Sequence, residues 1–242
     1  MMFTLVSTPR SIIMSTIEQN LQAVRHTIIA CEHEAGRAAD AVQLLAVSKT
    51  FGFEAVQAAM QAGQTAFGEN YLQEALDKIA ALAYAEPALE WHFIGPIQSN
   101  KTRPIAEHFD WVHTVEREKI ALRLSEQRPP DLPALNICLQ VNISGEASKS
   151  GVAPFELAAL AHRVAGLPNL RLRGLMAIPE PATGFEQQRL AFAQVRELYQ
   201  QLRADGLNLD TLSMGMSGDM RAAIVEGATM VRVGSAIFGA RN

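Results

Sequence analysis

Short apolar segments alternate along the chain with longer segments in which apolar residues recur at helical spacing. The apolar segments predict eight strands, at 44–48, 65–68, 90–94, 110–114, 136–142, 172–177, 211–214 and 229–233. Helical patterns lie between them, at 54–62, 70–83, 116–127, 154–165 and 186–203 among others. One further helix, at about 15–36, precedes the first strand, with Ser15 or Thr16 as its expected N-cap.

Eight successive strand–helix units predict a single-domain (β/α)₈ barrel, a TIM barrel, over residues 15–242. Residues 1–14 are expected to form a disordered extension, and Met14 is an alternative start of the protein. An open, doubly wound sheet is the competing architecture. It usually has fewer strands, and the dinucleotide fingerprint GxGxxG does not follow the first strand.

Composition narrows the classes of partner. The chain has 242 residues and a net charge of -4, and its lysines and arginines are scattered, which does not favour nucleic-acid binding. No apolar segment is long enough to span a bilayer, and the N-terminus lacks the positive region of a secretory signal. Cys31 and Cys138 are expected to be buried free thiols, and the six histidines form no metal-binding pattern. We therefore expect a cytoplasmic protein without a metal site.

The polar residues of the predicted strands collect where the strands end. This set comprises Lys49, Asn70, His92, His113, Asn142, Ser213, Ser217, Arg232 and Ser235, with Met176, Met214 and Gly234 around them. In a (β/α)₈ barrel the carboxyl ends of the strands and the loops after them carry the chemistry. The pattern therefore indicates a site at this end of the barrel.

The last two of these loops resemble a phosphate site. The segments SMGMSGDM (213–220) and VRVGSAIFG (231–239) follow the seventh and eighth predicted strands and supply glycines and hydroxyl groups. Loops in these positions form the recurrent phosphate site of (β/α)₈ barrels, where backbone N–H groups can approach an anion. The alternative is that the glycines only form turns.

Lys49 ends the buried segment LLAVSKT (44–50) and, by barrel closure, lies near the eighth strand. Its ammonium group could bind the phosphate as a point charge. It could instead be an amine with a lowered pKa, ready to condense with an aldehyde, with Arg232 as the neighbouring cation. A third interpretation is a lysine that extends from the barrel rim into water.

Several long motifs resemble one known family. They are LLAVSKT, FGENYLQE, WHFIGPIQSNK, HFDWVHTVER, NISGEASKSG, RLRGLMAIP, LSMGMSGDM and MVRVGSAIFGAR, and they cover nearly the whole chain from about residue 16. Together they are similar to the pyridoxal phosphate homeostasis protein family, which is related to the N-terminal barrel domain of alanine racemase. This resemblance implies a protein that binds pyridoxal 5′-phosphate (PLP) and serves vitamin B6 homeostasis.

The resemblance also implies roles for individual residues. Lys49 would hold PLP as a covalent aldimine (a Schiff base), and Arg232 would face the pyridine nitrogen. Ser217, Gly234 and Ser235 would bind the phosphate, mostly through backbone N–H groups. Asn70, His92 and Met176 would line the ring. Ser235 stands where many relatives have threonine, which retains the hydroxyl group.

Three functions are compatible with these residues: a non-catalytic PLP carrier, a PLP-dependent racemase of the alanine racemase type, and a cofactor-free aldolase-like barrel. A barrel uses about 200–250 residues, which leaves no room for the second domain of the racemases. A guanidinium group only donates hydrogen bonds, whereas enzymes that use PLP as a strong electron sink place an acid at the ring nitrogen. The aldolase needs an acid near Lys49 that the sequence does not show. We therefore expect a carrier.

We expect a monomer whose partners are PLP and PLP-requiring apo-enzymes. Lys149, in the loop after the fifth predicted strand, could be a second amine near the cofactor or a docking point for such enzymes. A solvated loop lysine is the simpler interpretation.

Overall fold

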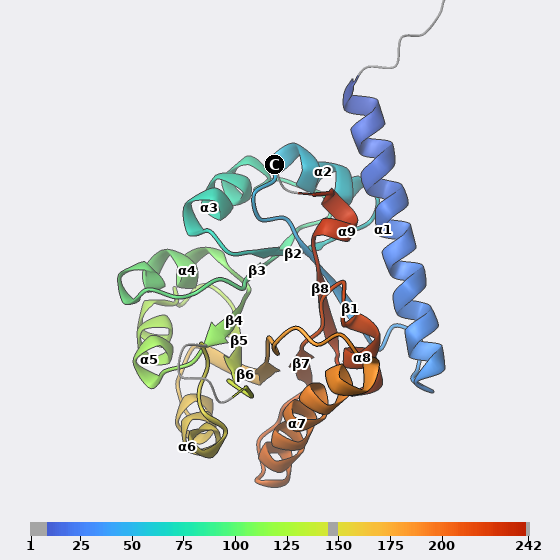
Figure 1. Cartoon of the computed structure of the whole chain (residues 1–242). Helices are drawn as coiled ribbons and strands as arrows, with labels where there is room; N and C mark the ends of the chain where they lie inside the picture. The colour runs from blue at the N-terminus through green and yellow to red at the C-terminus, as the bar shows by residue number, and fades with distance from the viewer. Residues whose placement is uncertain (1–8, 145–149, 241–242) are drawn as a thin grey trace, which may run out of the picture.

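The computed structural model describes residues 9–144 and 150–240, with side chains from residue 16 onward. Eight parallel strands form one closed barrel in which neighbours in sequence are neighbours in space. Helices surround it, so the fold is a TIM barrel, as predicted (Figure 1). Lys149 and residues 1–8 of the predicted extension lie outside the described residues.

The strands are short and buried on both faces. They are β1 Gln43–Val47, β2 Ala66–Glu69, β3 Glu90–Phe93, β4 Trp111–Val115, β5 Leu135–Gln140, β6 Leu170–Met176, β7 Thr211–Ser213 and β8 Met230–Val233. Each predicted strand coincides with one of them to within two residues at either end. Continuous apolar segments are typical of parallel strands that are covered by helices on one face and by other strands on the other.

The helices follow the strands in alternation. They are α1 Pro9–Glu34, α2 Phe53–Gln61, α3 Leu72–Ala81, α4 Thr102–His108, α5 Glu118–Gln127, α6 Pro154–Ala165, α7 Phe185–Ala204, α8 Met220–Val225 and α9 Ser235–Phe238, with a 3₁₀ turn, η1, at Ser99–Lys101. Pro154 occupies the first turn of α6 and Gly166 caps its end, as the sequence indicates.

The expected N-cap of the first helix is wrong. Helix α1 begins at Pro9, so Ser15 and Thr16 lie within it rather than at its start. A proline is well suited to a first helical turn because its fixed φ angle is helical and its missing N–H would have no partner there. The boundary that we expected between an extension and the barrel therefore falls inside a helix.

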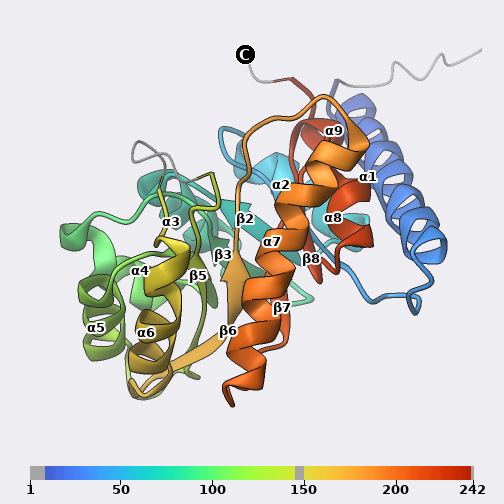
Figure 2. The same cartoon turned by 60° about the horizontal axis from the view of Figure 1, so that its bottom comes forward.

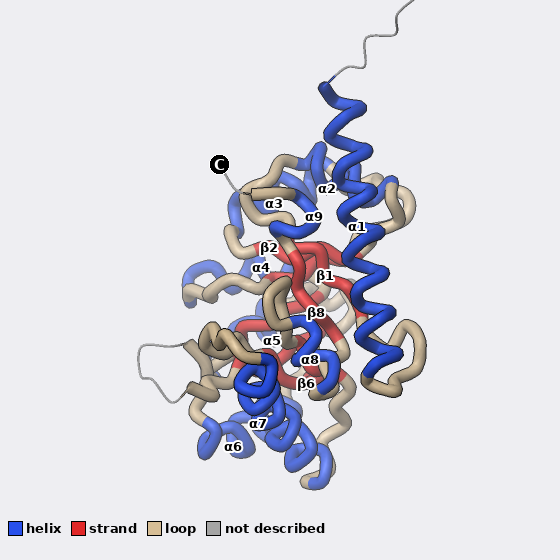
Figure 3. The backbone as a smooth tube through the Cα atoms, turned by 45° about the vertical axis from the view of Figure 1, so that its right-hand side comes forward, coloured by secondary structure: helices blue, strands red, loops and turns tan. Residues whose placement is uncertain are grey.

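Helix α1 covers the seam at which the barrel closes. Strand β1 pairs with β8 from Gln43 with Met230 to Ala46 with Val233. Across this seam α1 packs against α2, α8 and α9 (Figures 1 and 3), and α7 lies next to α8 (Figure 2). The helix thus covers β1 and β8, the two strands that lie next to the predicted phosphate loops.

The core has two parts. The larger part lies between the strands and the surrounding helices and includes Phe67, Phe109 and Phe192. Two smaller clusters fill the barrel interior, one of Leu45, Ala66 and Met230 and one of Trp111, Cys138 and Met176. The barrel is therefore a packed core, and a ligand can reach only its end. Cys31 and Cys138 are buried free thiols, as expected.

Candidate functional site

A cavity of about 250 Å³ opens at the carboxyl ends of the strands. Seven of the eight predicted site residues line it: Lys49, Asn70, Met176, Ser217, Arg232, Gly234 and Ser235. Met176 belongs to β6 and Arg232 to β8, and the other five come from the segments that follow β1, β2, β7 and β8. Residues almost 190 positions apart in the chain meet here because the barrel closes between β1 and β8.

Strand geometry directs these side chains inward. Leu45 belongs to an interior cluster and pairs with Arg232 across the seam. Side chains along a strand alternate between its two faces, so Val47, two residues after Leu45, is on the same face and lines the cavity, and Lys49 follows it in the turn after β1. The same spacing places Gly234, two residues after Arg232, beside the cavity. Lys49 and the loop after β8 therefore share one wall.

A buried ammonium group fixes the backbone on both sides of Lys49. Lys78 Nζ donates to the carbonyl oxygen of Ser48 at 2.8 Å, to Glu69 Oε1 at 2.8 Å and to Glu74 Oε1 at 2.5 Å. Glu69 Oε1 also accepts from Ser48 Oγ, and Glu74 Oε1 accepts from the backbone N–H of Thr50. These contacts hold the turn that presents Lys49 to the cavity.

Arg232 is almost fully buried and rigidly held. Its Nη1 donates to the carbonyl oxygen of Ser213 at 2.6 Å and to Ser213 Oγ at 2.9 Å, and its Nη2 donates to the carbonyl oxygen of Ala177 at 2.9 Å. Burial lowers the pKa of Arg232 to about 10, and Asp219 opposes this shift. The group is therefore still a cation at neutral pH, and it faces the cavity as a fixed donor.

His92 does not line the cavity. Its side chain is fully buried in the barrel interior, where Nδ1 lies 2.9 Å from His113 Nε2 and Nε2 lies 2.6 Å from Glu90 Oε1. Burial lowers the pKa of His92 and, more strongly, that of His113. The two histidines and Ser213, all named from strand ends, thus form a layer beneath the cavity rather than its wall.

The loops after β7 and β8 present backbone donors. Within the described residues, the N–H groups of Ser217, Gly218 and Ser235 donate no backbone hydrogen bond. Gly234 lies so close to the end of β1 that an added Cβ would be 3.0 Å from the carbonyl oxygen of Val47. The loops can therefore approach an anion through their backbone.

Sequence reasoning missed the apolar wall of the cavity and one glycine. Val47, Ile94, Ile178 and Met216 line it, as does Gly218. Gly218 and Met216 both lie inside the SMGMSGDM motif, so the sequence could have indicated them. Val47, Ile94 and Ile178 carried no such signal because a strand-end valine or isoleucine looks the same as a core residue.

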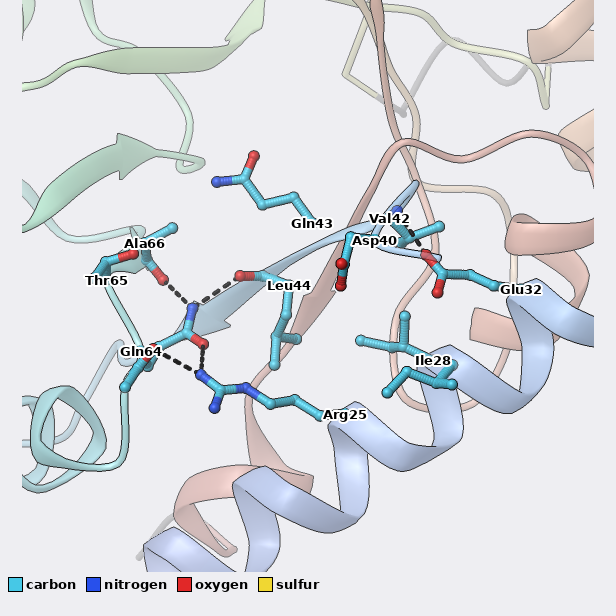
Figure 4. Close-up of a pocket in the computed structure, with 12 residues that line it drawn as sticks. Arg25, Ile28, Glu32, Asp40, Val42, Gln43, Leu44, Gln64, Thr65 and Ala66 are labelled. Carbon is cyan, nitrogen blue, oxygen red and sulfur yellow. Dashed lines mark hydrogen bonds between the residues drawn. The ribbon is translucent and has the colours of Figure 1, made fainter. Parts of the chain in front are cut away.

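A second cavity, of about 260 Å³, lies at the opposite end of the strands, between α1 and the beginnings of β1 and β2 (Figure 4). Three of its polar side chains, Arg25, Glu32 and Gln64, already make hydrogen bonds. Arg25 donates to Gln64 and to the carbonyl oxygens of Ala62 and Gly63, and Glu32 accepts from the backbone N–H of Val42. Gln64 donates to two carbonyl oxygens in turn. These contacts attach α1 to the barrel.

The first cavity has the features of an incomplete site. Asn70 Oδ1 is buried and has no hydrogen-bond partner, so a ligand with a suitable donor would complete it. The cavity combines one amine, one fixed guanidinium and unpaired backbone donors, which fits a small anionic ligand with a carbonyl group.

Among the described residues, no group of three or more histidine, cysteine or acidic side chains could hold a metal ion. No helix in that same part of the chain is long and apolar enough to cross a membrane.

Comparison with known proteins agrees with this arrangement. Residues 19–242 match the family described as the alanine racemase N-terminal domain. The chain is 63% identical over 229 residues to a pyridoxal phosphate homeostasis protein of Pseudomonas aeruginosa, covering 95% of this chain and 97% of the relative. It is 58% identical over 231 residues to the protein of the same name from Vibrio cholerae, covering 95% and 98%.

The chain belongs to the pyridoxal phosphate homeostasis protein family. A solved protein of similar structure is PipY of Synechococcus elongatus, described with PLP bound. It is 37% identical, with a TM-score of 0.81, and the match covers 92% of this chain and all of PipY. The family and barrel expected from the motifs are thereby confirmed.

Proposed function

We propose that this protein binds PLP as a Schiff base on Lys49 and carries and buffers it in vitamin B6 homeostasis, with no or negligible turnover. The observation that supports this most is the single cavity that joins Lys49 to Arg232 and to the loops after β7 and β8. A homologous protein that is described with PLP bound adds support.

The attachment needs a neutral amine. Lys49 Nζ would attack the aldehyde carbon of PLP, form a C=N bond and release the aldehyde oxygen as water. Lys49 is half-buried and shares the cavity with the Arg232 guanidinium group. The turn held by Lys78 would keep the amine directed at the aldehyde.

The other lining residues would orient the cofactor. Backbone N–H groups around Ser217, Gly234 and Ser235 would bind the phosphate, and Asn70 and Met176 would lie against the ring. Arg232 would face the pyridine nitrogen. His92, which the family resemblance assigned to the ring as well, lies below this position and contacts His113 and Glu90 instead.

Two features favour a carrier over a racemase. Arg232 can only donate a hydrogen bond, so the ring nitrogen must accept and stay unprotonated, which weakens PLP as an electron sink. In addition, Lys49 and Arg232 are the only ionisable side chains among the described residues that line the cavity. Inversion at a carbon centre needs acid–base groups on two faces, and among the described residues that line the cavity the Lys49 amine is the one group suited to that role.

The test is a chemical one. The purified protein is mixed with PLP, its visible spectrum is recorded, and it is reduced with borohydride and mapped by peptide mass. We expect a yellow protein with a pyridoxyl group on Lys49, and loss of both signals in Lys49→Ala. Lys101→Ala, which removes an exposed lysine, should behave as wild type.

A protein that stays colourless and unlabelled after PLP is added would refute the proposal. Chiral analysis of L-alanine incubated with the loaded protein decides between carrier and racemase, and we expect no racemisation. A cytoplasmic location, a monomeric state and delivery of PLP to apo-enzymes are parts of the same proposal.

A further inference from the structure

A chain of four hydrogen bonds, three of them buried, runs through the barrel from Arg232 to Glu90. Arg232 Nη1 donates to Ser213 Oγ at 2.9 Å, and Ser213 Oγ lies 2.8 Å from His113 Nδ1. His113 Nε2 lies 2.9 Å from His92 Nδ1, and His92 Nε2 lies 2.6 Å from Glu90 Oε1. Ser213, His113 and His92 are completely buried.

The chemistry of the two ends, together with two neutral histidine rings, fixes the direction of every bond. A guanidinium group only donates, and an ionised carboxylate only accepts. With Glu90 ionised, His92 must donate from Nε2, which leaves its Nδ1 to accept from His113 Nε2–H. His113 Nδ1 must then accept from the hydroxyl group of Ser213, whose oxygen accepts from Arg232. All four donors therefore point from Arg232 towards Glu90.

The surroundings of the chain favour an ionised Glu90 and two neutral histidine rings. The hydrogen bond from His92 holds the pKa of Glu90 below its usual value, so this carboxylate is ionised at neutral pH. Burial lowers the pKa of both histidines, and the Arg232 cation lowers that of His113 further. Both rings are therefore neutral, and each has one donor and one acceptor, as the chain requires.

The rings are also held in place sterically. The indole of Trp111 stacks on His92 with 5.4 Å between ring centroids and 10° between ring planes, and it lies 5.9 Å from the His113 ring. Glu90 stands at the start of β3, and its side chain is 41% exposed. The chain thus joins the cavity end of the barrel to a carboxylate at the opposite end.

We infer that Ser213, His113 and His92 are positioning residues: they form a one-directional hydrogen-bond chain, anchored on Glu90, that orients the Arg232 guanidinium towards the cofactor ring. The inference rests on the proposed function for the identity of the ligand. None of the three residues lines the cavity, so they act on the cofactor only through Arg232. A purely structural role for the two histidines is the alternative.

The direction of the chain can be measured without PLP. Long-range ¹H–¹⁵N correlation spectra of histidine-labelled protein report which ring nitrogen carries the proton. We expect His92 and His113 to be neutral with the proton on Nε2 at pH 7. A charged ring, or a proton on Nδ1 of either ring, would overturn the inference.

The effect on the cofactor site is tested by PLP titration followed by absorbance. Ser213→Ala removes one hydroxyl group from the chain and should weaken PLP binding about tenfold, the effect of one lost hydrogen bond to a charged group. Cys138→Ala is the matched control. It removes one buried thiol from the barrel interior and should bind PLP as wild type does. Ser213→Thr, which keeps the hydroxyl group, should restore most of the affinity.

The outcomes separate the two proposals. If wild-type protein binds no PLP, the proposed function is refuted, and the ring tautomers still decide the direction of the chain. If wild type binds PLP and Ser213→Ala binds it equally well, or no worse than Cys138→Ala, the inference alone is refuted. Thermal unfolding of each variant verifies that it is folded before it is titrated.

Discussion

His113 shows how strongly a single buried residue can depend on the rest of the barrel. Its ring contacts Ser213, a hundred residues later in the chain, and His92, from the preceding strand. Burial holds its pKa well below the ordinary histidine value of 6.5. A proton on this ring would face the Arg232 cation and would break the hydrogen-bond chain at its centre.

The lowered pKa of His113 predicts that the stability of the protein depends on pH. Below pH 6.5 the unfolded chain binds a proton at this position and the folded protein does not, so stability is complete above pH 6.5 and is lost as the pH falls. His92 acts in the same direction, whereas Glu69 and Asp110, whose pKa values are raised by burial, act in the opposite one. The contribution of His113 is therefore best measured as a difference between two proteins.

We expect His113→Gln to lose less stability than wild type between pH 7.5 and pH 5.5, by about 1.4 kcal/mol. Urea unfolding at the two pH values gives each free energy of unfolding, and only the change with pH is compared. An equal change in both proteins would show that His113 titrates normally in the folded state.

For individual residues, the sequence indicated which ones belong to the site but not which residues they contact. Lys49, Arg232 and Ser235 could be named because polar groups at the ends of apolar strands are unusual. The layer formed by His92, His113 and Ser213 could not, because each contact joins different strands and depends on the stagger of the closed barrel. His92 was accordingly placed at the ring when it lies one layer lower.

Among the elements, the strands were the easiest to predict and the first helix was the hardest. Strands that are buried on both faces appear as apolar segments with clear ends, so all eight were located. Helix α1 begins six residues before Ser15. Several residues in this region could begin a helix, and a pattern alone does not rank Pro9 against the hydroxyl residues that follow it.

The loops of neighbouring strands touch at Gly95, next to the cavity. Gly95 follows β3, and a Cβ added to it would lie 2.2 Å from the carbonyl oxygen of Asn70 and 2.8 Å from its Cα. Both atoms belong to the backbone, so no side chain can move aside. The absence of a side chain at Gly95 therefore sets the position of Asn70 in the cavity wall.

Gly95→Ala should force these two loops apart. We expect a loss of about 1–3 kcal/mol in the free energy of unfolding, typical of overpacking, together with weaker PLP binding. Gly166→Ala is the control, because its added Cβ would meet its nearest atom at an ordinary 3.6 Å. Urea unfolding and PLP titration of both variants provide the comparison. Unchanged PLP affinity in Gly95→Ala would show that Asn70 does not depend on this contact.

For the whole molecule, the decisive feature is closure of the barrel at β1 and β8. Lys49 and Arg232 lie on either side of this seam, and α1 spans it on the outside (Figure 3). Asn20 of α1 donates from Nδ2 to the carbonyl oxygen of Ile237 at 3.0 Å, and Arg37, just after α1, donates to carbonyl oxygens of Ile224 and Ala228. The helix is therefore tied to both segments that carry the predicted phosphate loops.

The number and order of the strand–helix units were predictable from periodicity. The position of α1 over the seam between β1 and β8 was not. A helix that precedes the first strand has no place in the eightfold alternation, and its apolar face does not say which seam it covers. The packing of Leu21, which is completely buried, against the barrel answers this question.

Leu21→Ala should consequently destabilise the whole barrel rather than only the helix. We expect a loss of about 2–5 kcal/mol in the free energy of unfolding, the range for a buried leucine. Ile29→Ala is the control on the same helix, because Ile29 is 52% exposed, and it should change stability by less than about 0.5 kcal/mol. Far-UV circular dichroism reports the helices, and fluorescence of Trp91 and Trp111 reports the buried barrel. If α1 is part of one cooperative unit, both signals will shift to lower urea together in Leu21→Ala. A helical signal that is lost before the tryptophan signal would instead show that the barrel closes without α1.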